Sequence, residues 1–291
     1  MPNKIINTQH HHFNLDDNQF LLKHANLPQI FSQEIINFLE KQIHPYPPKK
    51  EFRFLDIGCG TGKLSMQLIQ YFQKHFVTSA HLLDPLSSAI VLAQKHNQAK
   101  TASKSIHPST KLSFFKSKFE DFPISAIHND SLKYDFILCS HVFYYFENWE
   151  TIIEKCNTLL NSNGLLCILL KDDRGLEIFA LRERILTHLN FEVEDNLQVA
   201  CQLNKTLNQM IHLDHTNLSF NYNVRLSRQN SKNVFLDTVR ILRYIFHFPI
   251  NSFLHDKHVV CLIKDFIKTH TLGDNVIIPM KDLFFFLQPK R

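Results

Sequence analysis

The chain has 291 residues, of which 44% are hydrophobic and 20% are charged. This composition excludes a disordered polypeptide and supplies enough apolar surface for a core that needs neither disulfides nor a structural metal. The formal net charge of +5 is too small for a dedicated nucleic-acid binder, so a nucleic acid is not the expected partner.

The first part of the chain predicts a polar tail followed by a helix. Residues 1–27 are polar and contain no apolar segment typical of a secretory signal. Pro28 opens an amphipathic stretch that runs to Ile43, with Phe31 on its apolar face. The proline-rich segment 44–50 is typical of a linker. No apolar run reaches the roughly 18 to 20 residues of a membrane span, so we expect a soluble cytoplasmic protein without membrane contact.

Strand and helix patterns alternate in the middle of the chain. Apolar runs predict strands, and segments of helical spacing predict the helices between them. The strands are 52–57, one that ends with 81–84, 112–115, 134–139 and 164–170. The helices are 64–71, one opening at Pro85, 149–160 and 179–189. This alternation favours a doubly wound, mostly parallel sheet. Uninterrupted apolar strands indicate burial on both faces of the sheet.

The last third of the chain predicts two further strands and an insertion between them. Apolar residues alternate with polar ones over 191–199, as in a half-exposed strand, and 283–287 is a final apolar run. Between them, 201–271 holds an alternating stretch and two helical stripes, which we interpret as an inserted cap.

The expected fold class is therefore α/β: a Rossmann-like, doubly wound, seven-stranded, mostly parallel sheet with an N-terminal helical segment and an inserted cap. The expected division has four parts: 1–50, a polar tail and helical lid; 51–200, the core; 201–271, the substrate cap; and 272–291, the final strand.

Cysteine and histidine spacing argues against a metal centre. The six cysteines contain no C-x-x-C pair and mostly lie in apolar contexts, so we expect them to be reduced and buried. The runs at 10–12 and 212–215 hold histidines, but no further spaced ligand accompanies them. We expect no metal site.

The strongest motif is a glycine-rich turn after the first strand of the core. Asp56 is followed by Gly58, Gly60 and Gly62, and a helical pattern begins immediately afterwards. Glycine permits positive φ and lets a ligand approach the bare backbone, and the helix start presents N–H groups. The spacing does not fit a dinucleotide fingerprint, whose third glycine would fall on Lys63, and it does not fit a phosphate-binding loop.

This D-x-G-x-G-x-G arrangement resembles motif I of class I S-adenosylmethionine-dependent methyltransferases. The resemblance implies that Asp56 faces the ammonium end of the cofactor, while the three glycines cradle its methionine part. It also implies that Asp84, at the end of the second strand, binds the ribose hydroxyls; both oxygens of a carboxylate accept hydrogen bonds from a diol. S-adenosylmethionine is thus the expected cofactor.

The segment 117–123 resembles the part of this family that brackets the adenine. Many members carry an Asp where this chain has Lys118. The resemblance then assigns the adenine contact to backbone groups near Phe119 and Glu120.

A second group of candidate residues follows the fourth strand. Ser140, His141, Tyr144 and Tyr145 stand beyond the carboxyl end of this strand, where ligands bind in such sheets. We expect Ser140 beside the cofactor, and His141, Tyr144 and Tyr145 at the acceptor as catalytic and substrate-binding residues. A purely packing role for the tyrosines, and a His141 that is not a base, stay open as alternatives.

The order of these motifs resembles histamine N-methyltransferase and its relatives. The resemblance is strong over about residues 50–175 and implies that Asp195 also lines the acceptor pocket. The family's substrate-holding carboxylate falls on Leu27, and its pocket glutamine falls on His141. The resemblance therefore favours a small amine or heteroaromatic acceptor other than histamine.

We therefore expect an S-adenosylmethionine-dependent methyltransferase that N-methylates a small-molecule acceptor and is monomeric. Two alternatives stay open: a methyltransferase of RNA or protein that docks its substrate on basic residues of the cap, and a non-catalytic module that keeps the cofactor-binding fold.

Overall fold

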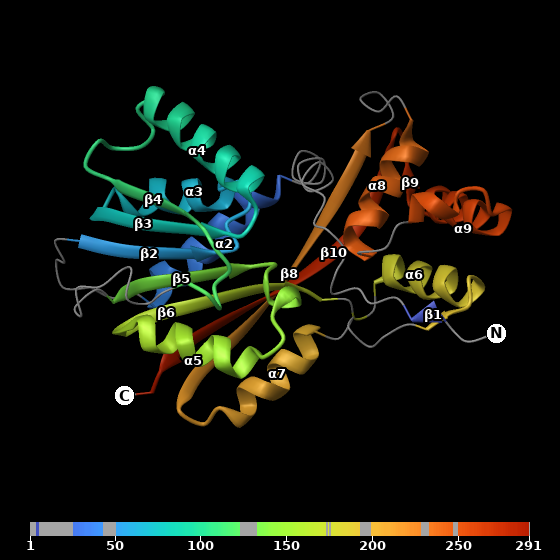
Figure 1. Cartoon of the computed structure of the whole chain (residues 1–291). Helices are drawn as coiled ribbons and strands as arrows, with labels where there is room; N and C mark the ends of the chain where they lie inside the picture. Colours follow the sequence, from blue (N-terminus) through green and yellow to red (C-terminus); the bar gives the residue numbers. More distant parts are fainter. Residues whose placement is uncertain are drawn as a thin grey trace. The chain divides into compact units, whose positions relative to one another are not determined.

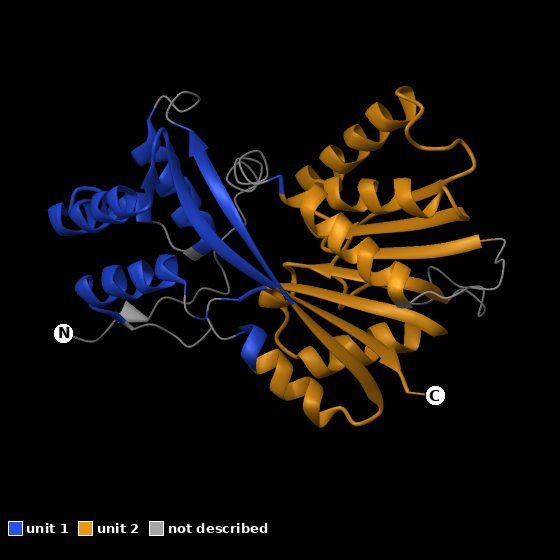
Figure 2. Ribbon diagram, turned by 180° about the vertical axis from the view of Figure 1, so that it is seen from behind, with its two compact units in different colours: residues 1–26, 171–201, 219–282 blue, residues 27–170, 202–218, 283–291 orange. Residues whose placement is uncertain are grey.

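A computed structural model describes residues 4–5, 26–42, 51–122, 133–172, 174, 176–192, 199–227, 233–246 and 250–290. The chain divides into two compact units, shown in Figure 2. Unit 1 comprises 1–26, 171–201 and 219–282, and unit 2 comprises 27–170, 202–218 and 283–291. These boundaries differ from those of the four expected parts, because two long strands, β8 (Leu213–Ser227) and β10 (Asn275–Pro289), contribute residues to both units.

The main sheet carries the strands in the order β4–β3–β2–β5–β6–β10–β8, and β9 (Thr271–Leu272) pairs antiparallel with β10 beside this path. The first five strands pair in parallel; their bounds are Lys111–Lys116 (β4), Val77–Asp84 (β3), Glu51–Ile57 (β2), Tyr134–Ser140 (β5) and Leu160–Lys171 (β6). The α/β fold with seven strands in a mostly parallel main sheet is confirmed.

The strand order places a topological switch point between β2 and β5. From β2 the chain moves outward through β3 to β4, and it then returns to the other side of β2 as β5 and continues to β6. The loops that leave β2 and β5 therefore diverge at neighbouring carboxyl ends. In open α/β sheets this is where ligands bind.

Helices follow the strands of unit 2 as the sequence predicts. Their bounds are Leu27–Gln42 (α2), Lys63–Phe72 (α3), Ser87–Ala102 (α4) and Trp149–Leu159 (α5), and a short 3₁₀ helix, η3, spans Phe143–Tyr145. Helices α2 and α3 lie on one face of the sheet and α5 lies on the other (Figures 1 and 2).

Aromatic side chains fill the space between β2 and α3. Phe52 and Phe72 are each 1% exposed, and their ring centroids lie 4.3 Å apart. Phe54 and Phe136 stack at 5.7 Å across the β2–β5 pair. This packing buries the face of the central strands that α3 covers and anchors the helix that follows the turn after β2.

Unit 1 is mostly helical. It contains α6 (Glu177–His188), α8 (Val234–Phe246), η5 (Ile250–Phe253) and α9 (Lys257–Thr269), together with parts of β8 and β10. Its two-stranded sheet pairs β1 (Lys4–Ile5) with β7 (Phe191–Glu192) in parallel. None of the helices among the described residues is long and apolar enough to cross a membrane.

The strand expected over 191–199 is confirmed at its start and contradicted at its end. Phe191–Glu192 is a strand that pairs with β1 outside the main sheet, whereas Val199 begins helix α7 (Val199–Gln209). Residues 193–198 lie outside the described residues. The main sheet instead gains β8, from the stretch assigned to the cap. An alternating pattern reports a half-buried strand without saying which sheet it joins.

The cysteines are free, as expected, but not all of them are buried. Cys139, Cys156 and Cys167 are buried in unit 2, whereas Cys261 is exposed. Cys261 stands on α9, a strongly amphipathic helix whose buried side chains include Val259 and Leu262. Cys261 has apolar neighbours in the sequence because those neighbours are buried on one face of α9, whereas Cys261 itself lies on the exposed face.

Candidate active site

The glycine-rich turn after β2 bends over the end of β3. The backbone N–H groups of Gly58 and Cys59 both donate to the carbonyl of Leu83, at 2.8 and 3.0 Å. Gly58, Gly60 and Gly62 have φ values of 72°, 53° and 70°. These are left-handed conformations that a residue with a Cβ adopts only with strain, so the expected positive φ at these glycines is confirmed.

The three glycines serve two different purposes. A Cβ on Gly58 would lie 2.7 Å from Val142 Cγ2, and one on Gly62 would lie 2.9 Å from the Cβ of Ala93. These two glycines therefore permit close packing against the segment after β5 and against α4. A Cβ on Gly60 would meet nothing within 4 Å. The backbone at Gly60 thus faces open space, as a loop that cradles a ligand requires.

Asp84 ties the turn to the end of β3. Its side chain is 7% exposed and accepts two backbone hydrogen bonds, from Gly60 N–H at 2.9 Å and from Leu86 N–H at 2.8 Å. Burial raises the pKa of this carboxyl, and the two hydrogen bonds act in the opposite direction. Each carboxylate oxygen keeps further acceptor capacity, so Asp84 is suited to a hydroxyl-bearing ligand at this edge.

Asp56 carries a buried carboxylate near the end of β2, two residues before Gly58. The side chain is 2% exposed, and the hydroxyl of Ser65 on α3 donates to its Oδ2. Its Oδ1 is buried and has no hydrogen-bond partner among the described residues. Burial raises the pKa of Asp56 to about 7; the Ser65 hydrogen bond lowers it, and the charge of Asp84 raises it. A buried acceptor of this kind fits an ammonium group, which would supply both a donor and the compensating charge.

The predicted adenine segment adjoins Asp84. The N–H of Ser117 donates to the carbonyl of Asp84 at 3.2 Å, which fixes the segment beside the end of β3. Phe119 is 2% exposed, whereas Lys118 and Glu120 are exposed. The segment that holds Phe119 and Glu120 is therefore joined to the end of β3, and their contact with adenine stays a prediction. The last residue of the predicted segment, Pro123, lies outside the described residues.

The segment after β5 lies next to the glycine turn. Ile57 pairs with Cys139, so Gly58 and Ser140 follow neighbouring strand positions. His141 has a positive φ of 53°, and its N–H donates to the carbonyl of Leu169 at 2.8 Å. A non-glycine residue in this conformation carries strain, and strain of this kind occurs often at functional sites.

Four rings form an aromatic cluster beyond β5. The ring of His141 lies nearly parallel to that of Tyr144, with centroids 6.4 Å apart and an interplanar angle of 12°. Tyr144 and Tyr145 meet edge to face at 6.5 Å. Phe31 of α2 adds a fourth ring, 5.8 Å from His141. The sequence assigned Phe31 only to a helix face; helical spacing shows that a side chain is buried but not which loop it contacts.

Tyr145 connects this cluster with Asp84. The Tyr145 side chain is 39% exposed, but the dense protein around its hydroxyl and the charge of Asp84 raise its pKa to about 12. Tyr145 therefore stays a neutral phenol at physiological pH. The predicted residue Asp195 lies outside the described residues, so its place in the acceptor site stays a prediction.

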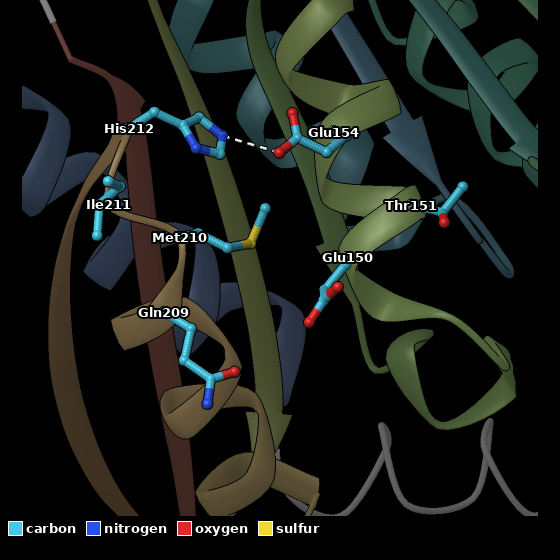
Figure 3. Close-up of a pocket in the computed structure, with 7 residues that line it drawn as sticks. All are labelled: Glu150, Thr151, Glu154, Gln209, Met210, Ile211 and His212. Atoms are coloured by element: carbon cyan, nitrogen blue, oxygen red, sulfur yellow. Dashed lines mark ion pairs between the residues drawn. The ribbon is translucent and has the colours of Figure 1, made fainter.

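A surface pocket of about 500 Å³ lies elsewhere in unit 2, between α5 and the turn that joins α7 to β8 (Figure 3). It is lined by Glu150, Thr151, Glu154, Gln209, Met210, Ile211 and His212. His212 Nε2 and Glu154 Oε1 form an ion pair at 2.8 Å. None of the predicted site residues lines this pocket, so it is not the acceptor site that the sequence predicts. No group of three or more metal-ligating side chains occurs in the described part of the chain.

Residues 24–210 match a protein family described as "Methyltransferase domain". Among curated proteins, the chain is 29% identical over 116 residues to a ubiquinone biosynthesis O-methyltransferase of Glaesserella parasuis, covering 40% of this chain and 44% of that protein. It is 25% identical over 146 residues to malonyl-[acyl-carrier protein] O-methyltransferase 1 of Ilyobacter polytropus, covering 50% and 47%. The chain thus spans less than half of the length of these two relatives.

The fold also occurs in solved structures. The plantazolicin methyltransferase BpumL, in complex with a triazolic desmethylPZN analog and SAH, superposes with a TM-score of 0.51 at 12% identity and covers 98% of this chain and 95% of that chain. At this identity the likeness is one of fold.

Alanine substitutions should separate the packed glycines from the open one. Gly60→Ala adds only left-handed strain, which costs about 1–2 kcal/mol of stability. Gly62→Ala adds the same strain and a clash with Ala93, for a further loss of about 1–3 kcal/mol. Urea denaturation of both variants measures the difference. Equal losses would contradict the assignment of Gly60 to open space.

The stability of the protein should depend on pH through Asp56. The pKa of Asp56 is raised from 3.8 to about 7 in the folded state. Its contribution to the free energy of unfolding is therefore fully present below about pH 4 and is lost as the pH rises through about 7. The loss is at most about 4 kcal/mol. Asp56→Asn removes the titration and keeps an acceptor for Ser65. The unfolding free energy of the wild type, relative to this variant, should therefore fall from pH 4 to pH 8.

A control for this pH series is Asp256→Asn on unit 1. Hydrogen bonds from His188 and from the N-terminus of α9 lower the pKa of Asp256, so its contribution is lost only as the pH falls. If the difference in unfolding free energy between the wild type and Asp56→Asn stays constant from pH 4 to pH 8, Asp56 is ionised throughout this range. That result would contradict the prediction.

Proposed function

This chain belongs to the family of methyltransferase domains, and on that premise we propose that it transfers a methyl group from S-adenosylmethionine to a small amine or heteroaromatic nitrogen. Support comes from three sources: the D-x-G-x-G-x-G turn at the switch point, the two acids beside it, and the aromatic cluster beyond β5. The aromatic cluster is the observation that carries the choice of acceptor.

The cofactor would be held by groups already arranged around the glycine turn. Asp56 supplies a buried oxygen for the ammonium end, and Gly60 leaves the backbone bare for the methionine part. Asp84 accepts hydrogen bonds from the ribose hydroxyls, and the segment at Phe119 and Glu120 brackets the adenine. When bound, this cofactor supplies a methyl group on a positively charged sulfur, which is already activated for displacement.

The protein's own contribution is positioning. The rings of His141, Tyr144 and Tyr145 provide flat apolar faces against which an acceptor ring aligns, and their π-faces attract a cationic group. A ring nitrogen of His141 takes the proton that the acceptor loses. Tyr145, neutral because of its raised pKa, donates a hydrogen bond and does not add a negative charge.

Acceptor chemistry has a second candidate. The curated relatives reported above are named O-methyltransferases, which favours an oxygen acceptor; the resemblance to histamine N-methyltransferase favours nitrogen. The aromatic cluster suits a planar acceptor of either kind. We retain a monomeric, cytoplasmic enzyme as part of the proposal, and a macromolecular acceptor or a non-catalytic module as the alternatives that experiment must exclude.

Calorimetry with S-adenosylhomocysteine tests the cofactor site. The wild type should bind, and Asp84→Asn should weaken binding about 10-fold to 100-fold, because a hydrogen bond to a charged group is worth about 1.5–3 kcal/mol. Asp256→Asn is the matched control, since Asp256 also accepts two backbone N–H groups but caps α9 in unit 1. A wild type that gives no binding heat at millimolar ligand would refute the function.

A panel of acceptors tests the reaction. Wild-type protein is incubated with S-adenosylmethionine and small amines, azoles, phenols and carboxylates, and products are identified by mass spectrometry. We expect methylated amines or azoles, with kcat/KM lowered about threefold to tenfold in Tyr144→Ala through loss of ring contacts. Its affinity for S-adenosylhomocysteine should stay unchanged. Methylation of phenols or carboxylates alone would support the oxygen acceptor instead.

A further inference from the structure

The ammonium group of Lys155, on α5, is bonded to the turn that follows β4. Lys155 Nζ donates to the carbonyls of Phe119 at 2.5 Å, Glu120 at 3.0 Å and Phe122 at 3.1 Å. It also lies 4.7 Å from the centroid of the Phe119 ring. A lysine ammonium has three donors, so this geometry matches all three to backbone carbonyls of one turn. Few surface lysines are held in this way, because most keep their head groups in water.

This arrangement decides which side of the turn presents N–H groups. In a trans peptide the carbonyl and the N–H point in opposite directions, and the structure contains no cis peptide among the described residues. Because the carbonyls of Phe119 and Glu120 point at Lys155, the N–H groups of Glu120 and Asp121 point away from it. The turn therefore offers hydrogen-bond donors on the side opposite α5.

Helix α5 also holds the acceptor segment. At its start, Asn148 caps the helix by accepting from the N–H of Thr151 at 3.0 Å, and Trp149 Nε1 donates to the carbonyl of Phe143 in η3 at 3.0 Å. Lys155 lies less than two turns further along the same helix. One rigid element thus fixes both the segment with Tyr144 and Tyr145 and the turn with Phe119 and Glu120.

We propose that Lys155 is a positioning residue for nucleobase recognition: it orients the 119–122 turn so that backbone N–H groups select a base with an acceptor at ring position N1. This inference rests on the proposed function and names a contact with the base that is separate from the carboxylate missing at Lys118. Adenine carries a lone pair at N1, whereas hypoxanthine carries an N–H there, so a backbone donor accepts the first base and rejects the second.

The test compares two ligands on folded protein. Dissociation constants are measured for S-adenosylhomocysteine and S-inosylhomocysteine with wild type, Lys155→Met, Lys155→Arg and, as a control, Lys264→Met on an exposed face of α9. We expect the wild type to prefer the adenosine ligand about tenfold or more, as loss of one hydrogen bond implies. Lys155→Met should bring this ratio close to one, Lys155→Arg should restore part of it, and Lys264→Met should leave it unchanged.

A purely structural role predicts a different result. If Lys155→Met lowers the melting temperature but keeps the wild-type preference between the two ligands, the proposal is overturned while the function stands. Where Lys155→Met does not fold, the ratio of the two dissociation constants is measured for Lys155→Gln and Lys155→Arg instead. A ligand preference that is unchanged in both variants also overturns the proposal. Asp84→Asn serves as a comparison, since it should weaken both ligands by the same factor. A wild type that binds neither ligand refutes the inference together with the proposed function.

Discussion

The hydrogen bond between the Asp84 carboxylate and the backbone of Gly60 is the constraint on which the site depends. A buried carboxylate requires donors, and here they come from the glycine turn and from the start of the segment that leads into α4. The bond holds the turn after β2 against the end of β3 while the backbone at Gly60 stays open. A side chain two strands away from β5 thereby shapes the loop that a ligand would contact.

The second organising feature is the burial of two neighbouring acids, Asp56 and Asp84. Burial is the main cause of the raised pKa of both acids, and the charge of Asp84 adds a smaller increase to the pKa of Asp56. Ser65 satisfies one oxygen of Asp56 and leaves the other buried and without a partner among the described residues. Retaining such an atom is costly for a folded protein, and a cationic ligand removes the cost. The unpartnered oxygen of Asp56 favours a cationic ligand, and the open space at Gly60 leaves room for a ligand against the backbone of the turn.

The central strands and the glycine turn were predictable because their signals are local. The apolar run Phe136–Cys139 correctly predicts a strand, because a strand buried on both faces is apolar at every position. The alternation over 191–199 predicts a half-buried strand but names no partner, and its described start, β7, pairs with β1 outside the main sheet. For the same reason β8 was assigned to a cap although it completes the main sheet. Strand pairing between distant segments is a property of the whole chain, and no short window of sequence contains it.

Sequence alone determined the chemistry-bearing residue types and their spacing: Asp56 before three alternating glycines, Asp84 at a strand end, and the tyrosines after β5. Backbone sterics explain why, since positive φ and bare backbone require glycine at fixed intervals. Only the tertiary structure decided that Phe31 contacts His141, that Ser65 donates to Asp56, and that Lys155 donates to three carbonyls of a distant loop. Such contacts join residues between 9 and 110 positions apart, from Asp56–Ser65 (65 − 56 = 9) to Phe31–His141 (141 − 31 = 110). They exist because packing of helices on the sheet, and not local preference, sets which side chains meet.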